Sequence, residues 1–249
     1  LESDAYQDSF LIRKHAKSVP LIANLGAVQL NYGYGVDEAR RIVEMTEADS
    51  LVLHFNSLQE VFQDEGDVNF EKLLPKIEEI CKRLPVPVGA KEVGFGIDGS
   101  VAKKLHDVGV AYIDVAGAGG TSWSQVEKLR SKDPLRQRAA EAFNSWGIPT
   151  KVCLNSVRSV LPDVPLIASG GMKTGLDGAK AIAIGADLVG FARTLLKAAT
   201  ESVEAVLDVM EQIEFELKVA MFGIGARDIQ ALKETNRLVI NNRPIAEDL

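Results

Sequence analysis

The chain is short of cysteine, of basic residues and of long apolar runs, and each shortage excludes a class of protein. Its two cysteines, Cys81 and Cys153, lie far apart in no metal-type spacing, so we expect buried, reduced thiols of a cytoplasmic protein. The formal net charge of -7 argues against a nucleic-acid partner, which requires a basic face. No apolar run is long enough to cross a bilayer, and residues 1–10 are too polar for a signal peptide.

Apolar residues, by contrast, are plentiful. The 249 residues are 46% hydrophobic and 25% charged, which is the balance of a soluble protein with a sizeable core. The length suits one α/β barrel, and no linker or low-complexity segment divides the chain. We predict a single domain that covers residues 1–249.

Short apolar runs alternate with amphipathic stretches along the chain. The runs are rich in Val, Ile and Leu without strict alternation, which is typical of parallel strands buried on both faces. The predicted strands are residues 20–25, 50–55, 86–91, 111–116, 165–169 and 187–192. The predicted helices are residues 36–46, 70–83, 99–108, 125–130, 133–145, 176–184, one from about 194, and 201–221. The apolar stripe of the last helix is predicted to face the sheet.

This alternation predicts an α/β fold, a (β/α)8 TIM barrel. Six strands fall short of a closed barrel, and residues 1–17 offer only a polar segment of helical character. Either the N-terminal strands are absent from this chain or the sheet is open. We favour the first interpretation.

Two glycine-rich junctions near the end of the chain lie where a strand gives way to a helix. The first is Ser169-Gly170-Gly171, and the second ends in Ala192-Arg193. Junctions of this kind in the last two βα units are where (β/α)8 barrels bind phosphate, because backbone N–H groups at helix starts point at the anion. A plain turn is the alternative, but two junctions in succession favour a phosphorylated cofactor or substrate.

Polar side chains collect where the other predicted strands end, which is the edge where parallel barrels place their active sites. They are Asn24, His54, Asn56, Gln59, Glu60, Lys91, Thr121, Ser122 and Ser169. His54 alone would suit a hydrogen-bonded core position, but three further polar residues within seven favour a site. A lysine after a run of small apolar residues needs an anion to offset its desolvation, so Lys91 is predicted to be functional.

Three other features are weaker. Glu127 is either a solvated helix residue or part of the site. His15 and His106 lie in charged, helical surroundings and are expected at the surface. The stretch from Gly117 to Gly120 lacks the third-glycine spacing of a dinucleotide-binding fingerprint, so we do not expect a Rossmann site.

Five motifs together resemble the type 2 isopentenyl-diphosphate isomerases. They are Pro20-Leu-Ile-Ala-Asn-Leu-Gly-Ala27, His54-Phe-Asn-Ser-Leu-Gln-Glu60, Lys91-Glu-Val-Gly-Phe-Gly96, Gly117-Ala-Gly-Gly-Thr-Ser-Trp123 and Ser169-Gly-Gly-Met-Lys-Thr-Gly-Leu-Asp177. The second, third and fourth are specific in combination, whereas many flavin barrels share the fifth. Members of that family carry a longer N-terminal part with the first two barrel strands, which matches the strand shortfall. The pair Gly89-Ala90 departs from the family, where larger apolar residues are usual.

The resemblance implies an enzyme that uses reduced FMN and Mg²⁺ to interconvert isopentenyl and dimethylallyl diphosphate without net redox change, with NADPH as reductant. Lys91, Thr121 and Ser122 would hold the flavin ring, and Glu127 would lie near the metal. The implied FMN-phosphate ligands are Gly170, Gly171, Ala192 and Arg193. Of the remaining residues, His54, Asn56 and Gln59 would face the substrate and Glu60 would bind Mg²⁺. The expected catalytic residues are His54, Gln59 and Lys91.

Two other functions stay open. An FMN-dependent oxidoreductase barrel would share the phosphate junctions and the lysine, but it takes its substrate proton with a histidine after a later strand. No histidine follows His106, which counts against that class. The other alternative is a non-catalytic barrel that binds a phosphorylated ligand. The resemblance also implies a homotetramer or homo-octamer, although no interface is readable from the residue pattern.

Overall fold

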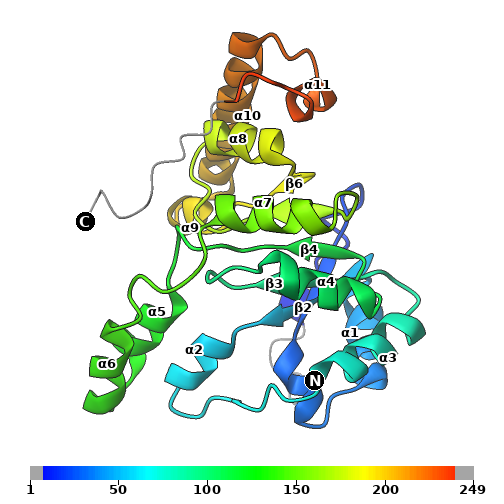
Figure 1. The fold of residues 1–249 in the computed structure, drawn as a ribbon, viewed down its shortest axis with the longest axis vertical. Coiled ribbons are helices and arrows are strands. Elements are labelled where there is room, and N and C mark those ends of the chain that lie inside the picture. The colour runs from blue at the N-terminus through cyan, green and yellow to red at the C-terminus, as the bar shows by residue number, and fades with distance from the viewer. Residues whose placement is uncertain (1–7, 239–249) are drawn as a thin grey trace.

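The computed structural model describes residues 8–238 and shows one parallel sheet flanked by helices (Figure 1). Its strands lie side by side in chain order: β1 (Ile22–Gly26), β2 (Ser50–Phe55), β3 (Val88–Glu92), β4 (Tyr112–Asp114), β5 (Leu166–Ala168) and β6 (Leu188–Val189). Every neighbouring pair is parallel. Parallel strands in sequential order with helical crossovers are the arrangement of an α/β barrel, as predicted. In the described sheet, β1 and β6 are the two edges.

The helices lie in the crossovers and after the last strand. In chain order they are η2 (Ala27–Asn31), α1 (Val36–Thr46), α2 (Ser57–Phe62), α3 (Leu73–Arg83), α4 (Gly99–Asp107), α5 (Trp123–Arg130), α6 (Pro134–Glu141), α7 (Thr150–Val160), α8 (Gly175–Ile184), α9 (Arg193–Ala199), α10 (Val203–Ile224) and α11 (Ile229–Lys233). None of them, within residues 8–238, has both the length and the apolar character of a membrane span.

The two faces of the sheet differ in chemistry. One face contributes to the buried apolar core under the helices, through Ala23, Leu25, Leu51, Leu53, Val88, Ala90, Ile113, Leu166 and Ala168. Because side chains alternate along a strand, the residues between these lie on the other face, which we call the inner face. One row of matched register positions crosses it from β1 to β6: Gly26, His54, Lys91, Asp114, Ile167 and Leu188. The polar residues of the sheet are therefore concentrated on the inner face.

The small residue Gly89 has a packing reason on this face. A Cβ atom at Gly89 would lie 2.1 Å from the ring of Tyr112, which occupies the space that a larger residue would need. The Tyr112 hydroxyl is anchored 2.8 Å from the Ser50 hydroxyl on β2. The Tyr112 ring from the neighbouring strand thus fills the space beside Gly89.

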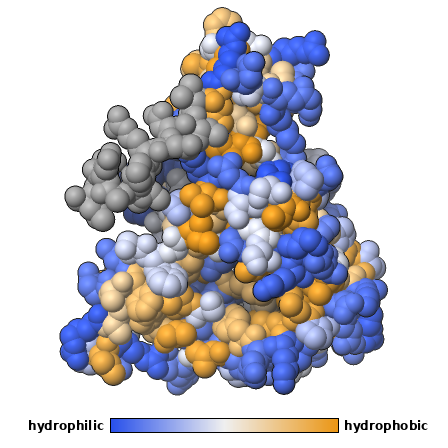
Figure 2. All heavy atoms as spheres, viewed as in Figure 1, coloured by the Kyte–Doolittle hydropathy of each residue, from blue (hydrophilic) through white to orange (hydrophobic). Residues whose placement is uncertain are grey.

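Helix α10 corrects one sequence prediction. It packs on α8 and α9 rather than on the sheet, and none of its residues is buried. Gly175 allows the close approach, since a Cβ there would lie 2.0 Å from the Ile213 carbonyl oxygen. Phe215, Val219 and Phe222 remain exposed, and Figure 2 shows apolar side chains at the surface of this upper part of the molecule. An apolar stripe predicts that a helix is covered, but not which element covers it.

Candidate active site

The inner face carries a line of polar side chains near the carboxyl ends of β1 to β5. His54, Lys91 and Asp114 occupy matched register positions on β2, β3 and β4. Asn24 on β1 and Ser169, directly after β5, extend the line through hydrogen bonds to His54 and Asp114. Four of these five residues were predicted from their place at strand ends, and the structure brings them together.

His54 is held as a neutral imidazole. Its Nδ1 atom lies 3.1 Å from the Asn24 Oδ1 atom, and because a carboxamide oxygen only accepts, Nδ1 carries the proton and Nε2 is free to accept. Burial and the positive charge of Lys91 lower the pKa of His54 to about 4. The imidazole is therefore uncharged at neutral pH, where it can act as a hydrogen-bond partner or as a proton acceptor.

This state predicts a pH dependence of stability. In the unfolded chain the histidine takes up a proton as the pH falls below 6.5, while the folded chain resists protonation until its pKa of about 4. The free energy of unfolding should therefore decrease as the pH is lowered from 6.5 to about 4. This dependence on pH should be weaker in His54→Gln. Imidazole NMR shifts measured against pH check the assignment, and a His54 titration above pH 6 would contradict it.

Lys91 has no carboxylate partner in the part of the chain that the structure describes. Its Nζ atom donates to the Glu92 carbonyl oxygen at 3.0 Å. The Glu92 carboxylate is occupied elsewhere, because its Oε2 atom accepts the backbone N–H groups of residues 93–96 and so shapes the loop after β3. The ammonium group is thus held by the backbone and available to an anionic ligand.

Asp114 is the residue of this line that the sequence prediction missed. Its Oδ1 atom accepts the Ser169 hydroxyl at 2.6 Å and the Ala116 N–H at 3.2 Å. Burial raises its pKa, against the lowering by the Ser169 hydrogen bond and the Lys91 charge. The aspartate lies within the apolar run Ala-Tyr-Ile-Asp-Val-Ala and was therefore read as part of a buried strand. Its spacing of two residues from Tyr112, which places both side chains on one face of the strand, could have indicated it.

The two glycine junctions adjoin at the ends of β5 and β6. The Thr194 hydroxyl donates to the Met172 carbonyl oxygen at 2.8 Å, which joins one junction to the other. Within residues 8–238, four backbone N–H groups at these junctions donate to no protein acceptor: Gly170, Gly171, Ala192 and Arg193. Two of these groups lie in the loop before α8 and two at the start of α9. Backbone N–H groups without a protein acceptor suit a phosphate, so this part of the site fits the phosphate of FMN.

The loop that contains Thr121 packs against the first junction. A Cβ on Gly170 would lie 2.1 Å from the Gly117 carbonyl oxygen, and one on Gly171 would lie 2.6 Å from the Gly119 carbonyl carbon. The Thr121 carbonyl oxygen is close to Gly94 in the loop after Lys91, and the Ser122 hydroxyl lies 3.0 Å from that of Ser124. The predicted ring-binding and phosphate-binding segments are therefore in direct contact.

Of the residues predicted to face substrate and metal, His54 lies on β2, whereas Asn56, Gln59 and Glu60 lie at or on α2. The Asn56 amide donates to Glu60 Oε1 at 2.5 Å, and Glu60 Oε2 accepts the Asp67 N–H at 2.8 Å. The Asn56 Oδ1 atom is buried without a hydrogen-bond partner. Gln59 points to α5 instead, where its amide donates to Glu127 Oε1 at 3.0 Å. Glu127 is buried and thus belongs to the site's surroundings, not to a solvated helix face.

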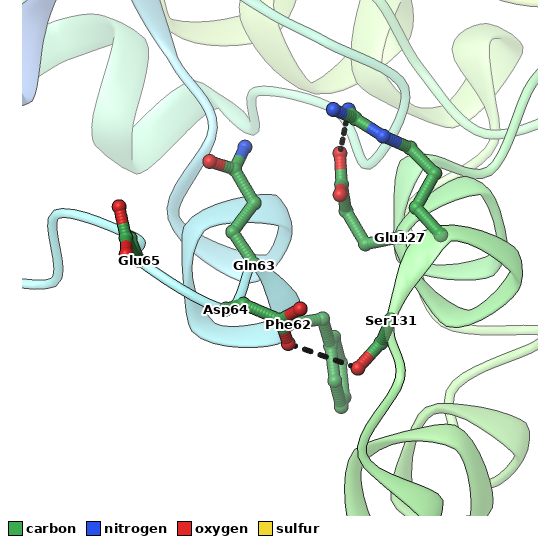
Figure 3. A pocket seen from close by; sticks show the side chains of 7 residues that line it. Phe62, Gln63, Asp64, Glu65, Glu127 and Ser131 are labelled. Atoms are coloured by element: carbon green, nitrogen blue, oxygen red, sulfur yellow. Dashed lines mark hydrogen bonds and ion pairs between the residues drawn. The ribbon is translucent and has the colours of Figure 1, made fainter.

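A pocket of about 300 Å³ opens beside this α2–α5 contact (Figure 3). Its lining includes Phe62, Glu127 and the facing pair Asp64 and Ser131, whose side chains form a 3.0 Å hydrogen bond. Arg130 pairs with Glu127 at the pocket. Of the residues predicted for the site, only Glu127 lines this pocket, and no residue of the inner face does. The pocket is therefore not taken as the place where the reaction occurs.

The comparisons with known proteins agree with this geometry. A family model described as FMN-dependent dehydrogenase matches residues 36–239. Among solved structures, a lactate oxidase from Pediococcus acidilactici aligns with a TM-score of 0.63 at 20% identity, over 87% of this chain and 60% of that one. A GMP reductase from Trypanosoma brucei aligns with a TM-score of 0.55 at 22% identity, over 85% of this chain and 43% of that one. The chain thus spans less than two thirds of either structure. The chain is an α/β barrel of the FMN-dependent dehydrogenase class.

Curated relatives narrow this class further. An isopentenyl-diphosphate delta-isomerase from Oceanobacillus iheyensis is 66% identical over 247 residues, covering 99% of this chain and 71% of the relative. A second isomerase of the same name, from a Nostoc species, is 51% identical over 96% of this chain and 68% of its own length. The chain belongs to the isopentenyl-diphosphate delta-isomerase family, which confirms the resemblance seen in its motifs.

Proposed function

We propose that the protein converts isopentenyl diphosphate into dimethylallyl diphosphate with FMN bound along the inner face. The observation that carries this proposal is the line from Asn24 to Ser169, which ends beside two junctions with unpaired N–H groups. The membership in the isomerase family and the match to an FMN-dependent family model support it.

Each part of the flavin has residues suited to it. Gly170, Gly171, Ala192 and Arg193 would hold the phosphate, the first three through backbone N–H groups. The ring would lie by Thr121 and Ser122, with the Lys91 ammonium at its pyrimidine side, where a fixed cation stabilises the negative charge of the reduced ring. Bound reduced FMN would supply an electron-rich surface and a proton carrier for the shift of the double bond.

The substrate and its metal would lie between this face and α2. The neutral His54 imidazole and the Asn56 amide would orient the substrate. Gln59, whose NH2 group bonds Glu127, is a candidate to contact the substrate with its oxygen end and to relay a proton. Mg²⁺ prefers oxygen ligands and is often held by one or two carboxylates together with substrate phosphates. Glu60, next to the unpaired Asn56 oxygen, fits that pattern. In the described residues no three-residue cluster of metal-ligating side chains exists, so the diphosphate itself would complete the site.

A turnover assay tests the proposal and its main competitor. The protein would receive isopentenyl diphosphate, Mg²⁺ and FMN reduced with NADPH or dithionite under anaerobic conditions. An isomerase forms dimethylallyl diphosphate while the flavin stays reduced. The match to a dehydrogenase family model makes an oxidoreductase the second candidate. Consumption of the reduced flavin in proportion to product would favour that candidate and overturn the isomerase.

The metal assignment makes a prediction for Glu60→Gln. The change removes a negative charge from the proposed site, so the Mg²⁺ concentration for half-maximal activity should rise by about tenfold or more. Asp64→Asn is the matched control, since this carboxylate bonds Ser131 at the neighbouring pocket. A Mg²⁺ titration of activity checks both variants. An unshifted titration in Glu60→Gln would remove Glu60 from the metal site.

A further inference from the structure

The inner face holds one cation and one anion side by side. Among the described strand residues of this face, Lys91 and Asp114 are the two that carry charge, because His54 is neutral. They face each other across the β3–β4 pairing, yet they do not form a direct ion pair. Charges that are partly removed from water need compensation, and here each is the nearest available compensation for the other along the row.

Asp114 also joins two loops. Its Oδ1 atom fixes Ala116, whose φ of 35° is in the left-handed region that a residue with a Cβ rarely adopts, and it fixes the Ser169 hydroxyl at the start of the glycine junction. Ser169 in turn accepts the Gly117 N–H at its carbonyl oxygen, 3.1 Å away. One carboxylate therefore sets both the loop toward Thr121 and the junction at Gly170.

We propose that Asp114 is a positioning residue whose negative charge limits how strongly the site prefers reduced over oxidised FMN, acting against the Lys91 cation. The inference rests on the proposed function, since it requires FMN along the inner face. Oxidised FMN that takes up two electrons and one proton gains one negative charge on its ring. The Lys91 cation favours that added charge and Asp114 opposes it, so the pair sets the balance between the two states.

Asp114→Asn tests the charge and keeps the shape. The asparagine retains an Oδ1 acceptor for Ser169 and Ala116, but it lacks the negative charge. We expect the ratio of the dissociation constants of oxidised and dithionite-reduced FMN to rise by about tenfold, as expected for one unit charge removed near the ring. Fluorescence and absorbance titrations of both FMN states under anaerobic conditions measure the ratio.

Ser169→Ala is the matched control, since it removes the tie and keeps the charge. Both FMN states should then bind more weakly, by about fivefold for one lost hydrogen bond, with the ratio unchanged. An unchanged ratio in Asp114→Asn would overturn the inference while leaving the proposed function intact. If Asp114→Asn fails to fold by circular dichroism, Asp114→Ser, which keeps a polar acceptor without charge, carries the same expectation. A wild-type protein that binds FMN in neither state would overturn the proposed function as well.

Discussion

Lys91→Met should lower kcat for isomerisation by about 10²- to 10³-fold, which is the typical loss when a preorganised charge is removed from the reacting region. The methionine keeps most of the length of the lysine side chain and loses only the ammonium. The Lys91 ammonium bonds a backbone carbonyl and forms no ion pair with a carboxylate among the described residues, so under the proposed function its charge acts on the bound flavin. Affinity for reduced FMN should fall more than affinity for oxidised FMN.

The same substitution on the surface provides the control. Lys103 on α4 forms an exposed ion pair with Asp107, so Lys103→Met should leave kcat and FMN affinity unchanged. Steady-state turnover and anaerobic FMN titrations of both variants make the comparison. Wild-type turnover in Lys91→Met would reject the role of the lysine. Equal losses in both variants would point to a general effect of the substitution on folding.

Lys91 was predictable because of where it stands in the sequence. Parallel strands end at one edge, so polar residues that terminate separate apolar runs must meet there. The runs themselves were clear: the strand 50–55 and the helix 36–46 were predicted with the bounds that the structure gives to β2 and α1. The shared edge then brings together His54, Lys91 and Ser169, which are far apart in the sequence.

The missed elements show what periodicity does not reveal. Helix α2 has only six residues, too few for a helical repeat to stand out beside the polar residues that it carries. Helix α7 was not predicted, although Thr150, Cys153, Leu154 and Val157 are buried at helical spacing. Asp114 was missed for the opposite reason, since a single polar residue inside an apolar run reads as part of a buried strand.

Contacts between loops are the other unpredictable part of the site. Gly170 and Gly171 were predicted to leave room for a phosphate, and the structure adds a second requirement, because both also pack against the backbone of residues 117–119. Such a contact joins two segments some fifty residues apart, and nothing local in either sequence encodes it. The sequence therefore predicted the position of the junction, but not that Gly170 and Gly171 must also fit against the neighbouring loop.

This double requirement makes Gly171→Val the most damaging substitution that we predict. The residue has a φ of 79°, which a β-branched side chain adopts only with strain, and its Cβ would lie 2.6 Å from the Gly119 carbonyl carbon. Strain and overlap together should lower the free energy of unfolding by about 3 kcal/mol or more. FMN affinity should fall as well, because the contacted loop leads to Thr121.

Gly223→Val separates these causes from the loss of a glycine as such. Gly223 lies within α10, a Cβ there would meet nothing within 4 Å, and its φ is not positive. Its replacement should change stability by only a few tenths of a kcal/mol, the difference between the helix propensities of the two residues. Urea unfolding and FMN titration of both variants provide the measurements. A Gly171→Val protein with wild-type stability and FMN affinity would mean that the phosphate binds elsewhere and that the two loops can separate freely.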